Sequence, residues 1–479
     1  MYLGIDIGTS GVKAVLLHPD GHVAAQASAA LDVQRPQPLW SEQDPAEWWR
    51  ATETAVLALP AGLRAQVDGV GLAGQMHGAT LLGADDRPLR PAILWNDGRS
   101  HAECAALEAA VPDLRAIAGN IAMPGFTAPK LAWVRAHEPQ IFADTRHVLL
   151  PKDYIRLLMT GDRVSDMSDS AGTLWLDVAR RDWSDELLAA TGLTRGHMPR
   201  LVEGSEIGGT LRAEVAARWG MASVPVAGGA GDNAAGAVGV GVVRDGDALL
   251  SLGTSGVIFV ATDTLRANPD GAVHAFCHCL PGLWHQMSVH LSAAVCLDWA
   301  AAMMHLSVPG MLAAAEAEGA GQGSELFLPY LSGERTPHND PHVRGAFLGL
   351  SHDSSAGRMA AAVLEGVAFA HADGLAALQA AGTRIESLSV IGGGARSTWW
   401  GRIIAAALNV RLDYLDGGEV GPALGAARLA QIAATGADPA TICTRPPVRE
   451  SINPDPALAE RLAPKLARFR SAYAAIRTI

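Results

Sequence analysis

The chain has 479 residues, of which 49% are hydrophobic and 18% are charged, and its formal net charge at pH 7 is -12. A chain of this length exceeds what one hydrophobic core usually organises, so we expect two domains. The charge is spread without a basic block, which argues against a nucleic-acid partner. Because the first predicted strand starts at Tyr2, we expect no signal peptide. The longest apolar runs are interrupted by Gly, Asp or Asn well before 18 residues, so we also expect no membrane segment and a cytoplasmic location.

The first elements form a predicted β-meander. Residues 2–7 and 12–17 are rich in branched apolar residues and read as antiparallel strands joined by the turn Gly8-Thr9-Ser10-Gly11. A second turn at residues 18–21 leads to a third predicted strand over 22–27.

Polar residues then follow two apolar strands of the first half. A helix is predicted over 45–59, with Asp44 as its N-cap. The strand over 67–73 ends in Gly-Gln-Met-His-Gly, and a strand over 224–227 ends in Gly-Gly-Ala-Gly-Asp-Asn. Open α/β sheets bind ligands at such carboxyl ends, so we expect a site there.

The second half begins as the first does. Predicted strands over 248–252 and 257–261 enclose a second Gly-Thr-Ser-Gly tetrad, 245 positions after the first. A helix over 356–381, a strand over 387–391 and the glycine-rich loop 392–397 follow, and an amphipathic helix closes the chain despite Pro464.

The repeated turn predicts both the architecture and a phosphate site. A turn of Gly, Thr and Ser exposes backbone N–H groups and hydroxyls without bulky side chains, as an approaching phosphate requires. We expect two related α/β domains, residues 1–245 and 246–479, facing each other across a cleft. The sequence contains neither a P-loop nor a Rossmann glycine motif.

The cysteines offer one competing site. The chain has five, which is few and odd in number and favours reduced thiols over disulfides. Cys277-His278-Cys279, with His274 and His285 nearby, suggests a metal site. We favour buried thiols, because the segment alternates like a strand and lacks a second ligand pair at the usual spacing.

Together these motifs resemble the FGGY family of carbohydrate kinases, within the superfamily of actin, hexokinase and the 70-kDa heat-shock chaperones. The likeness covers essentially the whole chain and includes the signature-like regions 125–137 and 345–369. It implies an α/β protein of two related actin/ribonuclease H-like domains facing each other across a catalytic cleft. It also implies ATP and Mg²⁺ as cofactors.

The resemblance assigns the catalytic carboxylates. Asp232 follows an apolar strand among glycines that leave room for substrate, and it matches the family's catalytic base. Its structural alternative is a helix N-cap. Asp6 lies in an apolar strand, where an unpaired carboxylate is costly to bury, so we expect it to face the cleft. The resemblance places Asp6 near the metal ion.

The resemblance also implies the binding residues. Met76, His77, Asp232 and Asn233 match the sugar site, and Trp40, Trp95, Lys152 and Asp153 are weaker candidates for its lining. The residues expected to hold the nucleotide and its phosphates are Thr9, Ser10, Lys13, Gly253, Thr254, Ser255, Gly393, Gly394 and Ala395.

Segments 39–44, 74–78, 93–99 and 333–339 are most similar to family members that act on D-xylulose. The resulting prediction is ATP-dependent phosphorylation of D-xylulose at its 5-hydroxyl. A kinase for ribulose or D-arabinitol is the alternative within the family, and a nucleotide-gated chaperone or filament protein is the alternative outside it. A homodimer is common among such kinases.

Overall fold

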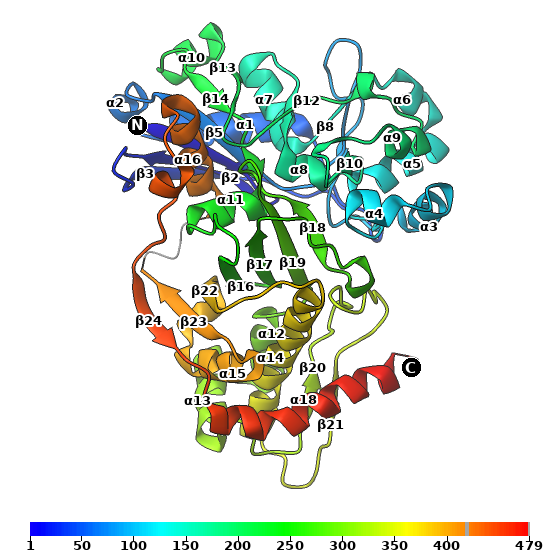
Figure 1. The fold of residues 1–479 in the computed structure, drawn as a ribbon, viewed down its shortest axis with the longest axis vertical. Coiled ribbons are helices and arrows are strands. Elements are labelled where there is room, and N and C mark those ends of the chain that lie inside the picture. The colour runs from blue at the N-terminus through cyan, green and yellow to red at the C-terminus, as the bar shows by residue number, and fades with distance from the viewer. Residues whose placement is uncertain (417–420, 478–479) are drawn as a thin grey trace.

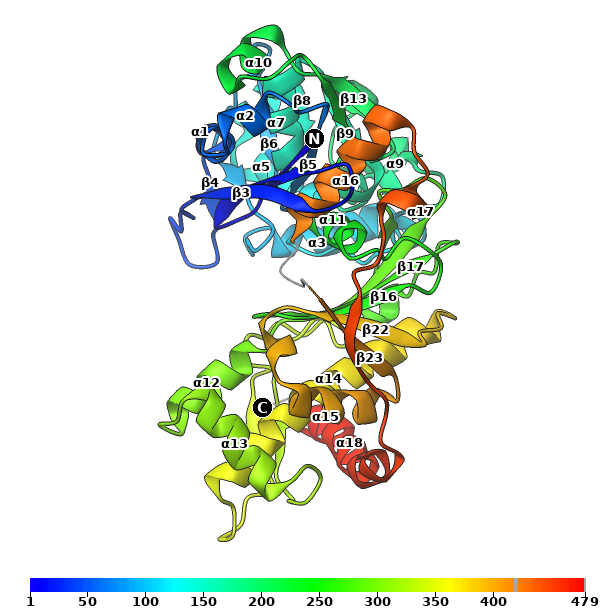
Figure 2. The same cartoon turned by 90° about the vertical axis from the view of Figure 1, so that its left-hand side faces the viewer.

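The computed structural model describes residues 1–416 and 421–477. The chain forms two lobes, each built on a seven-stranded mixed sheet (Figures 1 and 2). The first sheet has the order β13-β14-β5-β1-β2-β3, with β15 also paired to β5. Its strands are β1 (Tyr2–Ile7), β2 (Gly11–Leu17), β3 (Val23–Ala30), β5 (Gly69–Gly74), β13 (Ile207–Thr210), β14 (Pro225–Ala227) and β15 (Ala230–Gly231).

The second sheet has the order β18-β19-β17-β16-β22-β23-β24. Its strands are β16 (Ala248–Leu252), β17 (Gly256–Thr262), β18 (His274–Cys277), β19 (Trp284–His290), β22 (Ser387–Ile391), β23 (Arg411–Leu415) and β24 (Val448–Ile452). Each lobe thus opens with an antiparallel hairpin that contains one of the two tetrads, as predicted.

Helices cover both sheets. In the first lobe, α1 (Pro45–Leu57) packs on β2 and β3, and the side chain of its N-cap Asp44 accepts a hydrogen bond from the N–H of Ala46, as predicted. Other helices of this lobe are α3 (His101–Ala110), α5 (Thr127–His137), α7 (Pro151–Thr160), α8 (Met167–Ala171) and α11 (Asp232–Gly239). The second lobe contains α12 (Val295–Met303), α13 (Val308–Glu318), α14 (Ala356–Ala380), α15 (Thr398–Leu408) and α18 (Pro456–Ile476).

Helix α14 is the central helix of the second core. By length and composition it could cross a membrane, but 94% of its most apolar 18-residue window is buried inside the protein. It contacts α13, α15 and β20 (Leu326–Leu328), and its apolar character therefore follows from burial on all sides.

One helix of the second half leaves its own lobe. Helix α16 (Pro422–Thr435) packs on β1, β5 and α11, and both views place it among the elements of the first lobe (Figures 1 and 2). Glycine makes this close approach feasible, because a Cβ at Gly4 or at Gly71 would overlap with a backbone carbonyl of α16. The second half of the chain thus also covers the first sheet, which the sequence alone did not predict.

The two tetrads have identical sequences but different turns. In the first hairpin Ile7 pairs with Val12, and the N–H of Gly8 donates to the carbonyl of Gly11 at 3.0 Å. In the second hairpin Leu252 pairs with Gly256, and the N–H of Gly253 donates to the carbonyl of Ser255 at 3.1 Å. The second turn is therefore one residue tighter, which reverses the faces of the residues that follow it.

Candidate active site

A cavity of about 280 Å³ lies between the two lobes, and the four residues matched to the sugar site all line it: Met76, His77, Asp232 and Asn233. Met76 and His77 follow β5, and Asp232 and Asn233 begin α11, so the ends of neighbouring strands meet there. The residues that line the cavity are Met76, His77, Trp95, Met123, Gly125, Phe126, Asp232, Asn233, Ser251, Ser255, Val257, His274, Phe276, Met287, Val289 and Arg335. Its small volume suits a small ligand.

His77 offers the cavity a hydrogen-bond acceptor. Its Nδ1 lies 2.6 Å from the carbonyl of Gly172, and because a carbonyl only accepts, Nδ1 carries the proton and Nε2 has a free lone pair. Burial lowers the pKa of this imidazole to about 3, and the nearby charge of Lys130 lowers it further, so the ring is neutral.

The backbone of His77 adopts the left-handed region, with φ of 69°. Two donors hold its carbonyl in this conformation: Lys130 Nζ at 2.8 Å and Thr127 Oγ1 at 3.2 Å. A strained backbone that neighbouring groups fix in this way is typical of a functional site.

Two carboxylates lie close together beside the cavity. Burial raises the pKa of Asp232 to about 6, while hydrogen bonds from the N–H and side-chain amide of Asn233 at 2.7 and 2.9 Å oppose the rise. Burial and the charge of Asp232 raise the pKa of Asp6 to about 7, against the opposing charge of Lys13. Near-neutral carboxylates of this kind are suited to general base chemistry.

Asp232 is not the N-cap of its helix. The N-cap of α11 is Gly231, and Asp232 is the first helical residue, so its carboxylate is not required to cap the helix. The structural alternative that the sequence left open therefore does not explain this side chain.

A buried polar network fixes the loop that precedes Asp232. Arg156 donates to the carbonyls of Ala227 and Gly228 at 2.6 and 2.5 Å. The N–H of Gly231 donates to Ser168 Oγ at 3.1 Å, and this hydroxyl donates in turn to Asp166 at 2.5 Å. These supporting residues were not predicted from the sequence, because a buried arginine or serine carries no motif of its own.

Lys152 and Asp153 belong to this network and do not line the cavity, contrary to prediction. Lys152 Nζ contacts the carboxylates of Asp153, Asp166 and Asp169 at 2.6, 2.8 and 3.0 Å, and all four side chains are fully buried. Asp166 links these side chains through Ser168 to the loop that precedes Asp232. The three carboxylates outnumber the one ammonium, and burial raises the pKa values of Asp153 and Asp169.

Of the two tryptophans predicted to line the sugar site, one lines the cavity and the other does not. Trp95 lines the cavity and donates from Nε1 to Thr9 Oγ1 at 2.9 Å, which brings the first turn next to the sugar site. Trp40 does not line the cavity. The guanidinium of Arg99 stacks over its ring at 3.6 Å, so Trp40 is a packing residue.

Two glutamines hold the first turn in place. Thr9 Oγ1 donates to Gln75 Oε1 at 3.0 Å, and Gln43 donates to the carbonyl of Thr9 at 2.7 Å. The hydroxyl of Thr9 is therefore engaged within the protein, whereas Ser10 is exposed. The N–H of Gly8 is used within the turn, so Ser10 is the exposed residue with which this turn can donate to a ligand.

A second cavity of about 820 Å³ lies in the second lobe and includes two of the three residues predicted for the adenosine loop. Gly393 and Gly394 line it and Ala395 does not. Leu297, Val308 and Leu312 supply apolar walls, which suit a nucleobase.

The second turn joins the two cavities. Ser255 lines the small cavity, while Ala294, which lines the large one, donates its N–H to the carbonyl of Gly253 at 2.9 Å. Ala293 likewise donates to the carbonyl of Thr254 at 2.9 Å, so the turn carbonyls are occupied and Thr254 and Ser255 remain exposed. A polyphosphate that spans the two cavities would pass along this turn.

Several residues of the second half were not predicted for the sugar site. Arg335 and His274 both line the cavity, and Arg335 Nη1 lies 3.4 Å from His274 Nε2. The buried Glu334 accepts from the N–H groups of Arg335 and Leu291 at 2.8 and 3.0 Å. These bonds connect Arg335, which lines the cavity, with the segment at Leu291 that follows β19. Long-range contacts of this kind leave no signal in a single sequence.

The cysteines are free and buried, as predicted. Cys277 Sγ points to the carbonyl of Val178 at 3.5 Å and Cys279 Sγ to that of Ala234 at 3.9 Å, so the two thiols have separate partners. Burial raises the pKa of Cys277 to about 12, which keeps it protonated and a poor metal ligand.

Family models settle the relationship of the chain. The N-terminal domain model of the FGGY family of carbohydrate kinases matches residues 1–239, and the C-terminal domain model matches residues 248–434. The chain belongs to the FGGY family of carbohydrate kinases. The sequence-based prediction of this family is confirmed, and FGGY membership favours the kinase over the chaperone alternative.

Individual relatives agree with this FGGY assignment. The chain is 56% identical to "Xylulose kinase" of Escherichia coli (strain K12) over 99% of this chain and 98% of the relative. A solved structure named as a xyloylose kinase from Brucella ovis is 55% identical, with a TM-score of 0.96 over 100% of this chain and 99% of the other. The xylulose kinase structure from Rhodospirillum rubrum is 31% identical, with a TM-score of 0.93 over the same shares. These likenesses confirm the predicted α/β fold of actin/hexokinase-like domains.

Proposed function

We propose that this FGGY kinase transfers the γ-phosphoryl group of ATP to the 5-hydroxyl of D-xylulose. The observation that carries the proposal is the position of the second turn, which borders both the small polar cavity and the large apolar one. The names of its relatives support xylulose as the acceptor. Phosphoryl transfer asks a protein mainly to position reactants, neutralise charge and accept one proton, and this cleft has residues for each task.

Asp232 acts as the general base in this proposal. Its carboxylate takes the proton of the acceptor hydroxyl, the hydroxyl oxygen forms a bond to the γ-phosphorus, and the bond from that phosphorus to the leaving oxygen of ADP breaks. The raised pKa of about 6 places the base near neutral pH, where proton transfer in the transition state is most effective.

The cleft fits a magnesium ion at Asp6. Its Oδ1 is buried and has no hydrogen-bond partner among residues 1–416 and 421–477, and a carboxylate oxygen suits this hard cation. Asp6 would hold the ion directly or through water. When bound, Mg²⁺ would neutralise charge on the phosphate oxygens.

His77 and Asn233 orient the sugar in this proposal. The free Nε2 of His77 accepts a hydrogen bond from a sugar hydroxyl, and Asn233 holds the base. Replacement of His77 by Gln would remove the fixed acceptor. We expect KM for D-xylulose to rise about 10- to 100-fold, the value of one lost hydrogen bond that leaves a buried group unpaired, with a smaller change in kcat.

The test is ADP release with a panel of D-xylulose, L-xylulose, D-ribulose, L-ribulose, glycerol and D-arabinitol, applied to the wild type, Asp232→Asn and Asp353→Asn. Asp353 is exposed and serves as the matched control. We expect D-xylulose to give the highest kcat/KM, and Asp232→Asn to lower kcat about 10²- to 10⁴-fold. A higher kcat/KM with D-ribulose or D-arabinitol would show that D-xylulose is not the preferred acceptor, but it would leave the proposed mechanism unchanged. Near-normal activity of Asp232→Asn would remove the assignment of the base.

A further inference from the structure

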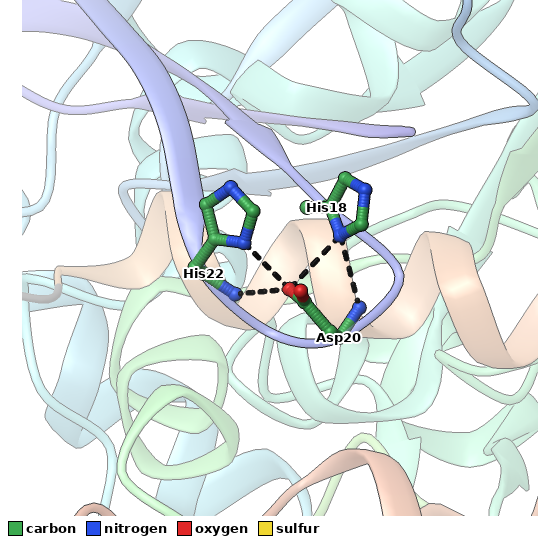
Figure 3. A group of neighbouring side chains, drawn as sticks. All are labelled: His18, Asp20 and His22. Carbon is green, nitrogen blue, oxygen red and sulfur yellow. Dashed lines mark hydrogen bonds and ion pairs between the residues drawn. The ribbon is translucent and has the colours of Figure 1, made fainter.

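A cluster of two imidazoles and one carboxylate lies on the hairpin between β2 and β3 (Figure 3), and none of its residues lines either cavity. His18 Nδ1 and His22 Nδ1 lie 2.9 and 2.6 Å from the same oxygen of Asp20. The three ligand atoms all lie within 4.8 Å of one another. The phosphoryl-transfer mechanism uses none of these side chains.

The hairpin itself brings the two histidines together. The N–H of His18 donates to the carbonyl of His22 at 2.9 Å across the base of the turn, just beyond the paired ends of β2 and β3. Their rings stack with centroids 4.6 Å apart. Because the backbone sets the pair, a ligand would not have to organise the two imidazoles from separate segments.

Asp20 completes the cluster from the turn. Its Oδ1 accepts from the N–H of His22 at 3.1 Å. A carboxylate is ionised at neutral pH and so can serve as a metal ligand. Pro19 also anchors the turn, since its carbonyl accepts from Gln431 of α16 at 3.0 Å.

We propose that His18, Asp20 and His22 form a binding site for a late first-row divalent cation such as Zn²⁺, Ni²⁺ or Cu²⁺. Two imidazole nitrogens and one carboxylate oxygen are the donor set that these ions prefer over Mg²⁺, and solvent would supply the remaining ligands. Bonds of about 2.0–2.1 Å in tetrahedral geometry require ligand atoms roughly 3.3 Å apart. The present spacings of 2.6 and 2.9 Å reach that value with small rotations of half-exposed side chains.

The site differs from the magnesium position in the cleft. A single carboxylate, Asp6, serves a hard cation there, whereas the hairpin offers nitrogen ligands beyond the other end of β2 from Lys13, the residue that pairs with Asp6. The hairpin should bind its cation whichever sugar the protein phosphorylates. The cation should bind without ATP, and millimolar Mg²⁺ should not displace it.

The experiment is equilibrium titration of the tag-free full chain with Zn²⁺, followed by a chromophoric competitor, in excess Mg²⁺ and without nucleotide. Variants are His18→Ala, His22→Ala, Asp20→Asn and the double variant His18→Ala/His22→Ala, with the exposed His352→Ala as the matched control. We expect one equivalent to bind to the wild type and to His352→Ala, and each single histidine variant to bind at least about tenfold more weakly.

A spectroscopic measurement reports the ligands themselves. With Cu²⁺ in place of Zn²⁺, the paramagnetic spectrum of the wild type should show coupling to two nitrogens, and that of His18→Ala to one. Thermal unfolding of the variants without metal checks that they fold, and the bound ion should raise the unfolding temperature of the wild type and of His352→Ala but not that of the double variant. The proposal is overturned if the double variant binds the ion as tightly as the wild type, or if the wild type binds none under these conditions.

Discussion

The two Gly-Thr-Ser-Gly turns share four residues and differ in almost everything around them. The first turn is held by neutral side chains of Gln43 and Gln75, and the carboxylates Asp6 and Asp232 lie beside it. The second is held by N–H groups at the start of α12 and carries no carboxylate in the place of Asp6, where Ser251 stands. One sequence motif thus supports two different local chemistries, which its neighbours determine.

The turn register explains the most visible substitution between the copies. Lys13 lies opposite Asp6 in the first hairpin. The corresponding Ile258 lies opposite Leu250 and is fully buried in the second core, because the second turn is one residue tighter. Val257 takes the place opposite Ser251, and both line the small cavity. A lysine at 258 would therefore point into a core and not at a phosphate.

The largest effect is expected from making the first turn chemically like the second. Asp6→Ser should lower kcat about 10²- to 10³-fold, as the loss of one preorganised catalytic group does in other enzymes. The Asp6→Ser variant should also be more stable than the wild type above pH 7. Because the pKa of Asp6 is raised to about 7, the folded wild type keeps this proton up to about pH 7, whereas the unfolded chain loses it near pH 4. The wild type therefore loses stability as the pH rises from 4 to 7.

Removal of this buried carboxylate should raise the free energy of unfolding by about 1–3 kcal/mol at pH 8, measured by denaturant titration. Ser251→Ala is the matched control at the second turn, and its kcat should stay within about tenfold of the wild type, the value of one neutral hydrogen bond. Equal losses of kcat in the two variants would show that the turns do not have divided roles.

The next effect tests the register of the second turn. Ile258→Lys should lower the free energy of unfolding by about 3 kcal/mol or more, because it places an unpaired ammonium in the second core. Ile258→Val is the control and should cost about 0.5–1.5 kcal/mol. If the lysine variant is as stable as the valine variant, residue 258 faces the cleft and the two turns have the same register.

The sequence predicted the strands that have strong local signals. Tyr2–Ile7, Ala248–Leu252 and Ser387–Ile391 are strands within the predicted bounds, because branched apolar runs between glycine turns need no long-range information. The site residues Met76, His77, Asp232 and Asn233 were named from the family likeness, and the structure brings them into one cavity.

Other features depend on contacts that no local pattern encodes. Lys152 was predicted from the sequence to line the pocket. Its ammonium is instead buried in ion pairs with three carboxylates, two of them more than ten positions away in the chain. The return of α16 to the first sheet depends on small residues at Gly4 and Gly71, whose partners lie hundreds of positions later. The register of the second turn likewise depends on the packing of Ile258 and not on the tetrad itself.

A smaller effect is expected at the second distinctive residue of the first turn. Lys13→Ile should lower kcat about 10- to 100-fold, the value of a charge-assisted hydrogen bond to a phosphate, since Lys13 is partly exposed and solvent screens its charge. Lys13→Arg keeps the charge and is the control. A loss confined to KM for D-xylulose would instead place Lys13 near the sugar, and an unchanged rate would mean that it is a solvated strand residue.

The smallest expected effect is on the pH dependence of the sugar reaction. The base must be ionised to accept a proton, and the pKa of Asp232 is about 6, so kcat/KM for the sugar should fall about tenfold per pH unit below that value and level off above it. The pKa of Asp6 is about 7, so Asp6 is mostly protonated over this acid limb, and Asp6→Ser removes little negative charge there. The acid limb should therefore stay within about half a pH unit of its wild-type position. Profiles of both proteins at saturating ATP and Mg²⁺ measure its position. A limb that moves to lower pH by about one unit or more would show that Asp6 is ionised while Asp232 titrates.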